Sequence, residues 1–317
     1  MRILIGLGGI TLYYNQCKSL YPSIERLARV GYTKLAEFIF TMFEWLYHTA
    51  VTANNLAAFY EEHGITIRHF HFNRIESNID VVKYYYTISY QRKPNVRAAC
   101  SLGYIAFQNE RYREALFYYK KAFKIRKRPE LYYNIAVQYS YLKQFEKAVP
   151  YLNKAICSLR GGYKRQASLL LIYVYAMLGY MQLAKEHYRN YISTYKEVDM
   201  DLLQLAFICQ EYDYIDRNCL ALSNEVGLRI TDVEVVLRSL YLVEKKKLAD
   251  YFLKKCLSNP SCYDKEQWEK QCQEVSEKIS GNNNQEYIPS LQVNPILHKK
   301  MYSYKEPSCY GKIGLPI

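Results

Sequence analysis

The chain has 317 residues, half of them hydrophobic, with 43 Lys and Arg against 30 Asp and Glu and a net charge of +13. Its 13 Gly and 9 Pro are too few for a collagen-like or Gly/Pro-rich disordered chain, so the composition indicates a folded protein. The positive charge attracts acidic partners, whether nucleic acid, anionic membrane or acidic protein, and does not distinguish among them.

The first 64 residues are predicted to form a helical segment, with helices over residues 22–30, 32–52 and 54–63. Residues 3–5 fit a short strand. The alternating run over residues 65–72 fits either a second strand or the first helix of a degenerate repeat. We prefer the helix, because its spacing to Val81 matches the repeat that follows.

Beyond this segment the chain repeats itself at intervals of 33 and 36 residues, in apolar residues that follow the period of an amphipathic helix. We interpret each copy as the second helix of an antiparallel pair, with Ala115, Ala148 and Ala184 buried at close helix contacts. Weaker copies surround Val81 and Ala249. The three clear copies are Tyr112, Ala115, Tyr119 and Ala122; Phe145, Ala148, Leu152 and Ala155; and Met181, Ala184, Tyr188 and Tyr191.

The helix before each of these copies repeats as well, and a short turn separates the two helices of each pair. Pro94, Pro129 and Pro260 fall at junctions between pairs, where a helix must stop. The corresponding positions are Ala99, Leu102, Gly103 and Ala106; Tyr132, Ile135, Ala136 and Tyr139; and Ser168, Leu171, Ile172 and Tyr175.

A period near 34 residues with this order of large, small and aromatic positions resembles the tetratricopeptide repeat. The resemblance implies an all-α fold, an α-solenoid of antiparallel helix pairs wound into a right-handed superhelix. The best repeats cover residues 95–197, and degenerate copies extend the array to residues 65–257. Ala99 and Tyr132 replace the usual Trp, and Ile172 stands where a small residue is expected.

The region after the array is predicted to hold a capping helix and a tail. A charged helix around Trp268, within residues 258–281, suits the end of an array, because terminal repeats need a polar outer face. Residues 282–317 lack periodicity and are predicted to be extended or disordered. This tail is long enough to fold back into a groove of the array.

No catalytic, cofactor or metal signature stands out. Gly6, Gly8 and Gly9 lack the third glycine of a dinucleotide-binding turn. On a helix, His69 and His71 diverge too far to share an ion. We therefore predict a non-enzymatic protein with no cofactor and no metal.

Cysteine usage and the apolar stretches bear on the compartment. The nine cysteines are odd in number and include no CxxC pair, which favours free thiols in a reducing compartment. Residues 167–181 are apolar, but a membrane span needs ~20 residues. The first ten residues loosely resemble a signal peptide but lack a small-residue cleavage site. We expect a cytoplasmic protein without a membrane span.

The densest basic run lies between Lys120 and Arg128. With Tyr118 and Tyr119 nearby it fits a surface that contacts phosphates and stacks bases. In a helical repeat the same run is the outer face and exit turn of a second helix, and we favour that solvated face.

In the tetratricopeptide family the first helix of each pair lines a concave groove. The same face here is aromatic and nearly uncharged, which suits a peptide held by apolar pockets and tyrosine hydroxyls. A chaperone-binding clamp is disfavoured, because only Asn134 matches it while Cys100 and Tyr104 replace its Lys and Asn. The predicted partner-binding residues are Tyr104, Phe107, Gln108, Tyr133, Asn134, Val137, Tyr141, Leu169, Tyr173 and Met177.

The leading hypothesis is a non-catalytic protein-interaction scaffold that binds a peptide or partner protein in the groove. One alternative is a basic protein associated with nucleic acid. Another is a regulator that senses a short peptide. We further expect Tyr104, Phe107, Tyr133, Tyr141 and Tyr173 to lie along one concave surface rather than in the core.

Overall fold

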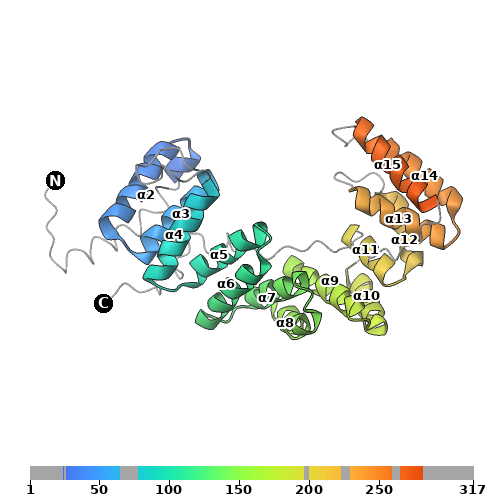
Figure 1. Cartoon of the computed structure of the whole chain (residues 1–317), viewed down its shortest axis with the longest axis horizontal. Coiled ribbons are helices and arrows are strands. Elements are labelled where there is room, and N and C mark those ends of the chain that lie inside the picture. Colours follow the sequence, from blue (N-terminus) through green and yellow to red (C-terminus); the bar gives the residue numbers. More distant parts are fainter. Residues whose placement is uncertain are drawn as a thin grey trace. The chain divides into compact units, whose positions relative to one another are not determined.

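A computed structural model of the chain describes residues 24, 26–64, 78–195, 200–222, 229–258 and 265–280. Every regular element within these ranges is an α-helix, which confirms the all-α prediction (Figure 1). The described residues fall into two compact units, which divide inside one helix, between Gln138 and Tyr139. The predicted C-terminal tail, at residues 282–317, lies outside the described residues.

The first unit is a series of helices in which neighbours along the chain pack together. The closest packing joins α3 to α4 and α5 to α6, and α2 packs on α3. The predicted helix over residues 65–72 lies outside the described residues, and the helix that precedes and packs on α4 is α3. The helices are α2 (Thr33–Tyr47), α3 (Ala50–His63), α4 (Asn78–Arg92), α5 (Val96–Gln108), α6 (Tyr112–Ile125) and the larger part of α7 (Pro129–Tyr141).

The helix predicted over residues 32–52 is wrong, because the chain breaks at His48 and Thr49 into α2 and α3. His48 adopts a left-handed conformation with φ 46°, and its N–H donates to the Glu44 carbonyl. Thr49 then caps α3: its hydroxyl accepts from the Thr52 N–H, and the Thr52 side chain accepts from the Thr49 N–H. This reciprocal capping box satisfies the backbone N–H groups of Thr49 and Thr52. Both groups would already be bonded inside a continuous helix, so the box is a feature of a helix start.

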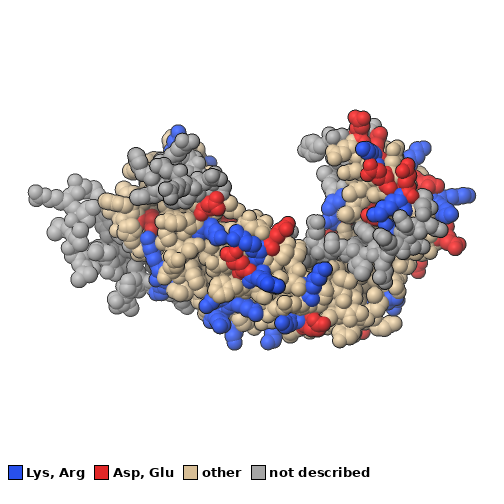
Figure 2. Space-filling model, in the orientation of Figure 1, with Lys and Arg blue, Asp and Glu red and all other residues tan. Residues whose placement is uncertain are grey.

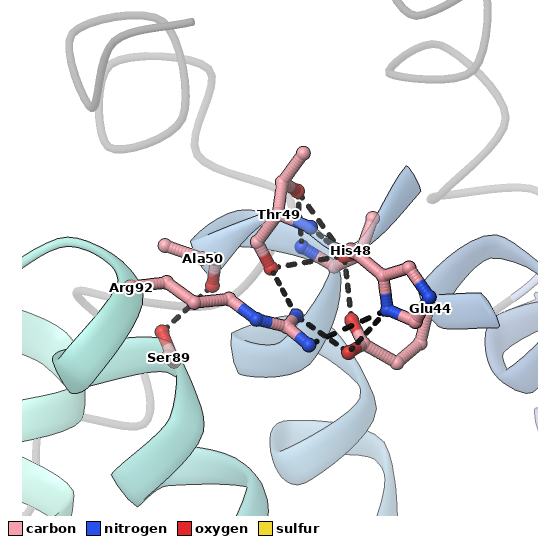
Figure 3. A network of polar contacts seen from close by, with 7 residues as sticks. Glu44, His48, Thr49, Ala50, Ser89 and Arg92 are labelled. Carbon is pink, nitrogen blue, oxygen red and sulfur yellow. Dashed lines mark hydrogen bonds and ion pairs between the residues drawn. The ribbon is translucent and has the colours of Figure 1, made fainter. Parts of the chain in front are cut away.

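A polar network ties α2, α3 and α4 together at this break (Figure 3). The Arg92 guanidinium donates to Glu44 Oε1 at 2.5 Å and to the Thr49 carbonyl at 3.1 Å. The Thr52 hydroxyl donates to Glu44 Oε2 at 2.6 Å. The Ser89 hydroxyl donates to a backbone carbonyl of α3. A carboxylate that is buried in this way needs such partners, so the network fixes how α4 lies against α2 and α3.

The second unit continues the pattern of consecutive helix pairs. Packing joins α9 to both α8 and α10, α11 to α12, and α13 to both α14 and α15. The charged helix α15 stands at the predicted capping position, with Trp268 buried and its indole N–H donating to the Cys256 carbonyl. The helices are the end of α7, α8 (Phe145–Ser158), α9 (Gly161–Met177), α10 (Met181–Thr194), α11 (Met200–Ile208), α12 (Tyr212–Leu222), α13 (Ile230–Leu242), α14 (Lys246–Leu257) and α15 (Lys265–Ser280).

The small residues lie where the repeat pattern predicts. Ala115, Ala148 and Ala184 are each 0% exposed, which confirms their predicted burial. In the first unit, a Cβ added at Gly103 would lie 3.1 Å from two ring carbons of Tyr119. Helices α5 and α6 therefore approach closely at a point where only glycine fits without displacing the ring.

The turn inside each pair also repeats, and it does so beyond the clear sequence repeats. Five turns share one hydrogen bond between an N–H and the carbonyl five residues earlier, the bond of a Schellman motif. In each turn the residue before that N–H has a positive φ. The bonds run from Arg111 to Ala106, Gln144 to Tyr139, Tyr180 to Tyr175, Glu211 to Ala206 and Lys245 to Leu240.

Candidate partner-binding surface

The first unit presents one part of the predicted binding face on α5. The helix begins at an N-cap, where Asn95 Oδ1 accepts from the Ala98 N–H at 2.8 Å. The Asn95 side-chain amide also donates to the Ser89 hydroxyl of α4 at 3.1 Å. Gly103 faces Tyr119 of α6 and Leu102 belongs to the core cluster, and the residues that remain more exposed stand near the C-terminal end of α5.

These more exposed positions include three of the predicted residues. Tyr104 and Phe107 are half-buried and Gln108 is exposed. The Phe107 ring packs against Tyr112 of α6, with 5.8 Å between the ring centroids. The three residues lie within about one helical turn, so they form a small aromatic and amide surface without a formal charge.

The prediction that α7 lines a groove is wrong for three residues. Tyr133, Asn134 and Val137 are 1%, 0% and 0% exposed, so none of them is available to a partner at the surface. The physical reason is that α7 is enclosed on all sides, so that even its polar residues Glu130, Asn134 and Gln138 are buried. When a helix is buried all round, spacing alone cannot assign its side chains to a binding face.

The second unit holds the remaining predicted residues. Tyr141, Tyr173 and Met177 are half-buried, whereas Leu169 is 7% exposed and belongs to the core. The Tyr173 ring lies edge-on to Phe145 of α8 with 6.3 Å between centroids, and burial raises the pKa of its hydroxyl. Tyr173 and Met177 are one turn apart on α9, as Tyr104 and Phe107 are on α5. That these residues share one concave surface stays a prediction.

The basic run lies where the solvated-face interpretation places it, at the end of α6 and in the connection to α7. Lys121, Lys124 and Lys127 are exposed, and the Lys121 ammonium lies 5.2 Å from the centre of the exposed Phe117 ring. In the face seen in Figure 2, Lys and Arg side chains gather over the part of the first unit that contains α6. Over α14 and α15 basic and acidic side chains alternate.

The described ranges hold no group of three or more His, Cys, Asp or Glu residues that could hold a metal ion. Six described cysteines are free thiols, five of them buried, and burial raises the pKa of the Cys209 thiol to about 12. Within the same ranges, no helix has the length and apolar character to cross a membrane. His69 and His71 lie outside the described residues.

A family model for the tetratricopeptide repeat matches residues 96–128 and 129–156, the α5–α6 and α7–α8 pairs. The chain therefore contains two segments, within residues 96–156, that match the tetratricopeptide repeat. The matched segments coincide with the two repeats that the sequence shows most clearly. The third repeat lies outside the matched segments, but its turn has the same Schellman hydrogen bond.

Solved structures share the fold of this chain. A tetratricopeptide repeat protein from Parabacteroides merdae is 13% identical, with a TM-score of 0.56, and the match covers 82% of this chain and 98% of that one. The C-terminal part of a repeat-containing protein from Cytophaga hutchinsonii is 14% identical, with a TM-score of 0.52 and coverage of 78% and 98%. No curated protein matches the chain.

Sequence reasoning predicted a short turn inside each pair but missed its left-handed residue and its shared hydrogen bond. Four of its five positive-φ positions are held by Glu110, Lys143, Gln210 and Glu244, and only Gly179 is a glycine. Glycine is the usual signal for such a position. The signal that remains is weak: a polar residue stands at this place in four of the five pairs, after a run of apolar ones.

Proposed function

We propose that the protein is a non-catalytic scaffold of the cytoplasm that binds a peptide or a partner protein. Tetratricopeptide repeats generally mediate protein–protein interactions. The observation that carries the proposal is the uncharged aromatic face of α5, where Tyr104, Phe107 and Gln108 remain accessible while the opposite face is buried. Tyr173 and Met177 give α9 a half-buried, uncharged surface of similar composition.

The chemistry of this face points to the kind of segment that it binds. Tyrosine offers a broad apolar surface at low entropic cost, and its hydroxyl both donates and accepts hydrogen bonds. The Gln108 amide adds a donor and an acceptor. The face has no cation for a terminal carboxylate, so the ligand is an internal segment with apolar side chains and free backbone amides.

A peptide selection tests this proposal. Peptides from a random displayed library are selected on the full-length protein and then measured against Y104A/F107A. Loss of two central aromatic contacts of ~2 kcal/mol each, ~4 kcal/mol together, is expected to weaken binding by about 1,000-fold. The matched control is Y163A/Y251A, which removes two exposed aromatics from other surfaces. Selected peptides that bind Y104A/F107A as tightly as the control contradict the proposal.

A second candidate function rests on the basic run. Lys121 lies over the exposed Phe117 ring, a combination of cation and aromatic face that suits single-stranded nucleic acid. Binding that survives physiological salt and falls in F117A/K121A supports this function. Weak binding that disappears as salt rises supports a merely solvated face.

A further inference from the structure

The polarity of α2 is inverted, which is a separate feature from the proposed peptide-binding face. Its two carboxylates, Glu37 and Glu44, are 0% and 7% exposed, whereas Trp45 is 69% exposed and Phe38 57%. We call the exposed apolar residues of α2, together with two that precede it, the outer face of α2. They are Val30, Tyr32, Leu35, Phe38, Met42, Trp45 and Leu46.

The outer face is a continuous stripe on one side of the helix. From Leu35 to Trp45 four of its members follow one another at steps of three, four and three residues, the spacing of side chains that share one side of a helix. Of the exposed large apolar side chains in the described ranges, seven lie within residues 30–46, and the other ten are spread over residues 79–251. A contiguous apolar patch of this kind marks an interaction surface.

The charges around the outer face are sorted by sign. Between residues 26 and 48 both carboxylates are buried on the opposite side of α2. The cations of the same stretch are exposed: Arg26 and Arg29 precede the helix, and Lys34 stands in its first turn. Arg29 also pairs with Glu62 of α3, at 3.6 Å. The outer face is therefore an apolar surface that is bordered by cations.

We propose that the outer face of α2 docks on the surface of a lipid bilayer that contains anionic lipids. The exposed rings of Trp45 and Tyr32 suit the boundary between headgroups and acyl chains, where such amphipathic rings are enriched. The aliphatic and Phe38 side chains enter the same boundary. Arg26 and Lys34, which are exposed beside the face, attract the anionic headgroups.

The charge pattern favours a bilayer over a second copy of the chain. A symmetric dimer brings the same patch of two copies together. The cations that border the face would then meet one another, and residues 26–48 offer no exposed carboxylate to pair with them. An anionic bilayer attracts these cations and covers the apolar side chains at the same time.

The fold presents the outer face on a fixed support. The inner side of α2 packs in the core with Phe40 and Phe43. Glu44 is held by the Arg92 guanidinium and by the Thr52 hydroxyl. Docking therefore needs no unfolding of α2, and the outer face enters the bilayer to a depth of about 5–10 Å, as interfacial helices do.

Sedimentation of the full-length protein with phosphatidylserine–phosphatidylcholine vesicles tests the proposal. The test variant F38A/W45A removes two exposed rings from the outer face and should weaken partitioning by roughly 100-fold. The matched control Y163A/Y251A removes two exposed rings from other surfaces and should bind as the parent does. All four positions are exposed, so both variants should keep the circular dichroism spectrum of the parent.

A second pair of variants tests the cations. R26Q/K34Q removes two positive charges beside the outer face and should weaken binding to the same vesicles by about 30-fold. The matched control K124Q/K127Q removes two exposed cations from the basic run at the end of α6 and should have an effect several times smaller. The parent should bind vesicles of phosphatidylcholine alone much more weakly.

Lipids that carry bromine on their acyl chains locate Trp45 directly, because bromine quenches only nearby tryptophan. The protein has two tryptophans, and Trp268 is buried in α15. Vesicles with brominated lipid should quench the fluorescence of the parent and leave that of W45F unchanged. W45F keeps an aromatic ring on the outer face, so it should still sediment with the vesicles.

Four outcomes overturn the proposal. A parent that does not sediment with phosphatidylserine-containing vesicles has no bilayer-docking face. Binding that F38A/W45A retains, without quenching of Trp45, excludes the outer face of α2. Equal losses in R26Q/K34Q and K124Q/K127Q assign the binding to net charge alone. Dimers that F38A/W45A dissociates in the absence of vesicles assign the face to a second copy. Because none of these readouts involves peptide binding at α5, failure here leaves the proposed function untouched.

Discussion

Gly103→Ala tests whether the close approach of α5 and α6 sets the geometry of the repeat. The new Cβ would lie 3.1 Å from Tyr119 Cε1 and Cζ and 3.3 Å from Cδ1. Tyr119 is 1% exposed, so its ring is enclosed and cannot swing into solvent. The same change at Gly162, in the first turn of α9, meets no atom within 4 Å.

The two substitutions should have opposite signs. Alanine in place of a helical glycine stabilises by roughly 0.5–1 kcal/mol, because the unfolded chain loses less entropy. At Gly103 this gain is set against overpacking, which costs about 1–3 kcal/mol. We therefore expect G103A to lower the free energy of unfolding by about 1 kcal/mol. G162A should raise it by up to ~1 kcal/mol, less near a helix end.

Urea denaturation followed by circular dichroism measures both effects in the full-length protein. A third variant isolates the contact: in a Y119L background the enclosed ring is gone, so the cost of G103A should disappear. The coupling between the two sites should then be about 1 kcal/mol or more, as is usual for residues in contact. If G103A stabilises as G162A does, the α5–α6 contact is not close and the repeat register is wrong.

Two further pairs of substitutions test the turns and the buried hydroxyls. Lys143→Gly relieves a non-glycine residue at φ 55° and should stabilise the folded protein by about 1 kcal/mol. Gly179→Ala, at φ 79°, should destabilise it by a similar amount. Effects of the same sign and size in the two variants would contradict the left-handed turn. Tyr86→Phe removes a hydrogen bond of 2.9 Å to the Glu61 carboxylate and should cost about 1.5–3 kcal/mol. Tyr119→Phe should leave the free energy of unfolding unchanged or raise it, because the buried Tyr119 hydroxyl has no hydrogen-bond partner within the described part of the chain. A loss of stability equal to that of Y86F would show that the hydroxyl has a hydrogen-bond partner.

The fold was predictable from the sequence at positions where only a small side chain allows two helices to pack closely. Ala115 and Ala148 recur at the repeat interval because a larger side chain would separate the two helices, and both are fully buried. The break between α2 and α3 was not predictable from apolar spacing, since hydrophobic residues continue through His48. What ends α2 is local: the capping box of Thr49 and Thr52, two residues that also occur inside helices.

The candidate site was predictable only in part, and the difference lies in the composition of the helices. On α5 small residues define a buried face, and Tyr104 and Phe107 outside it are half-buried; their place in a binding surface stays a prediction. On α7 both sides are buried, and Tyr133 and Val137 were assigned to a surface although they are 1% and 0% exposed. Spacing identifies a face only when the opposite side of the helix differs from it.

The repeated turn shows how the pairs are held. Glu110, Lys143, Gln210 and Glu244 adopt a left-handed conformation that costs a non-glycine residue roughly 1–2 kcal/mol, so their local preference opposes the turn. The conformation recurs because each turn joins two helices that pack against each other through their apolar faces. The Schellman hydrogen bond also satisfies a carbonyl at the end of the first helix. Tertiary packing between neighbouring helices therefore imposes the turn. This explains why the turn geometry persists in the degenerate repeats, where the sequence pattern has largely faded.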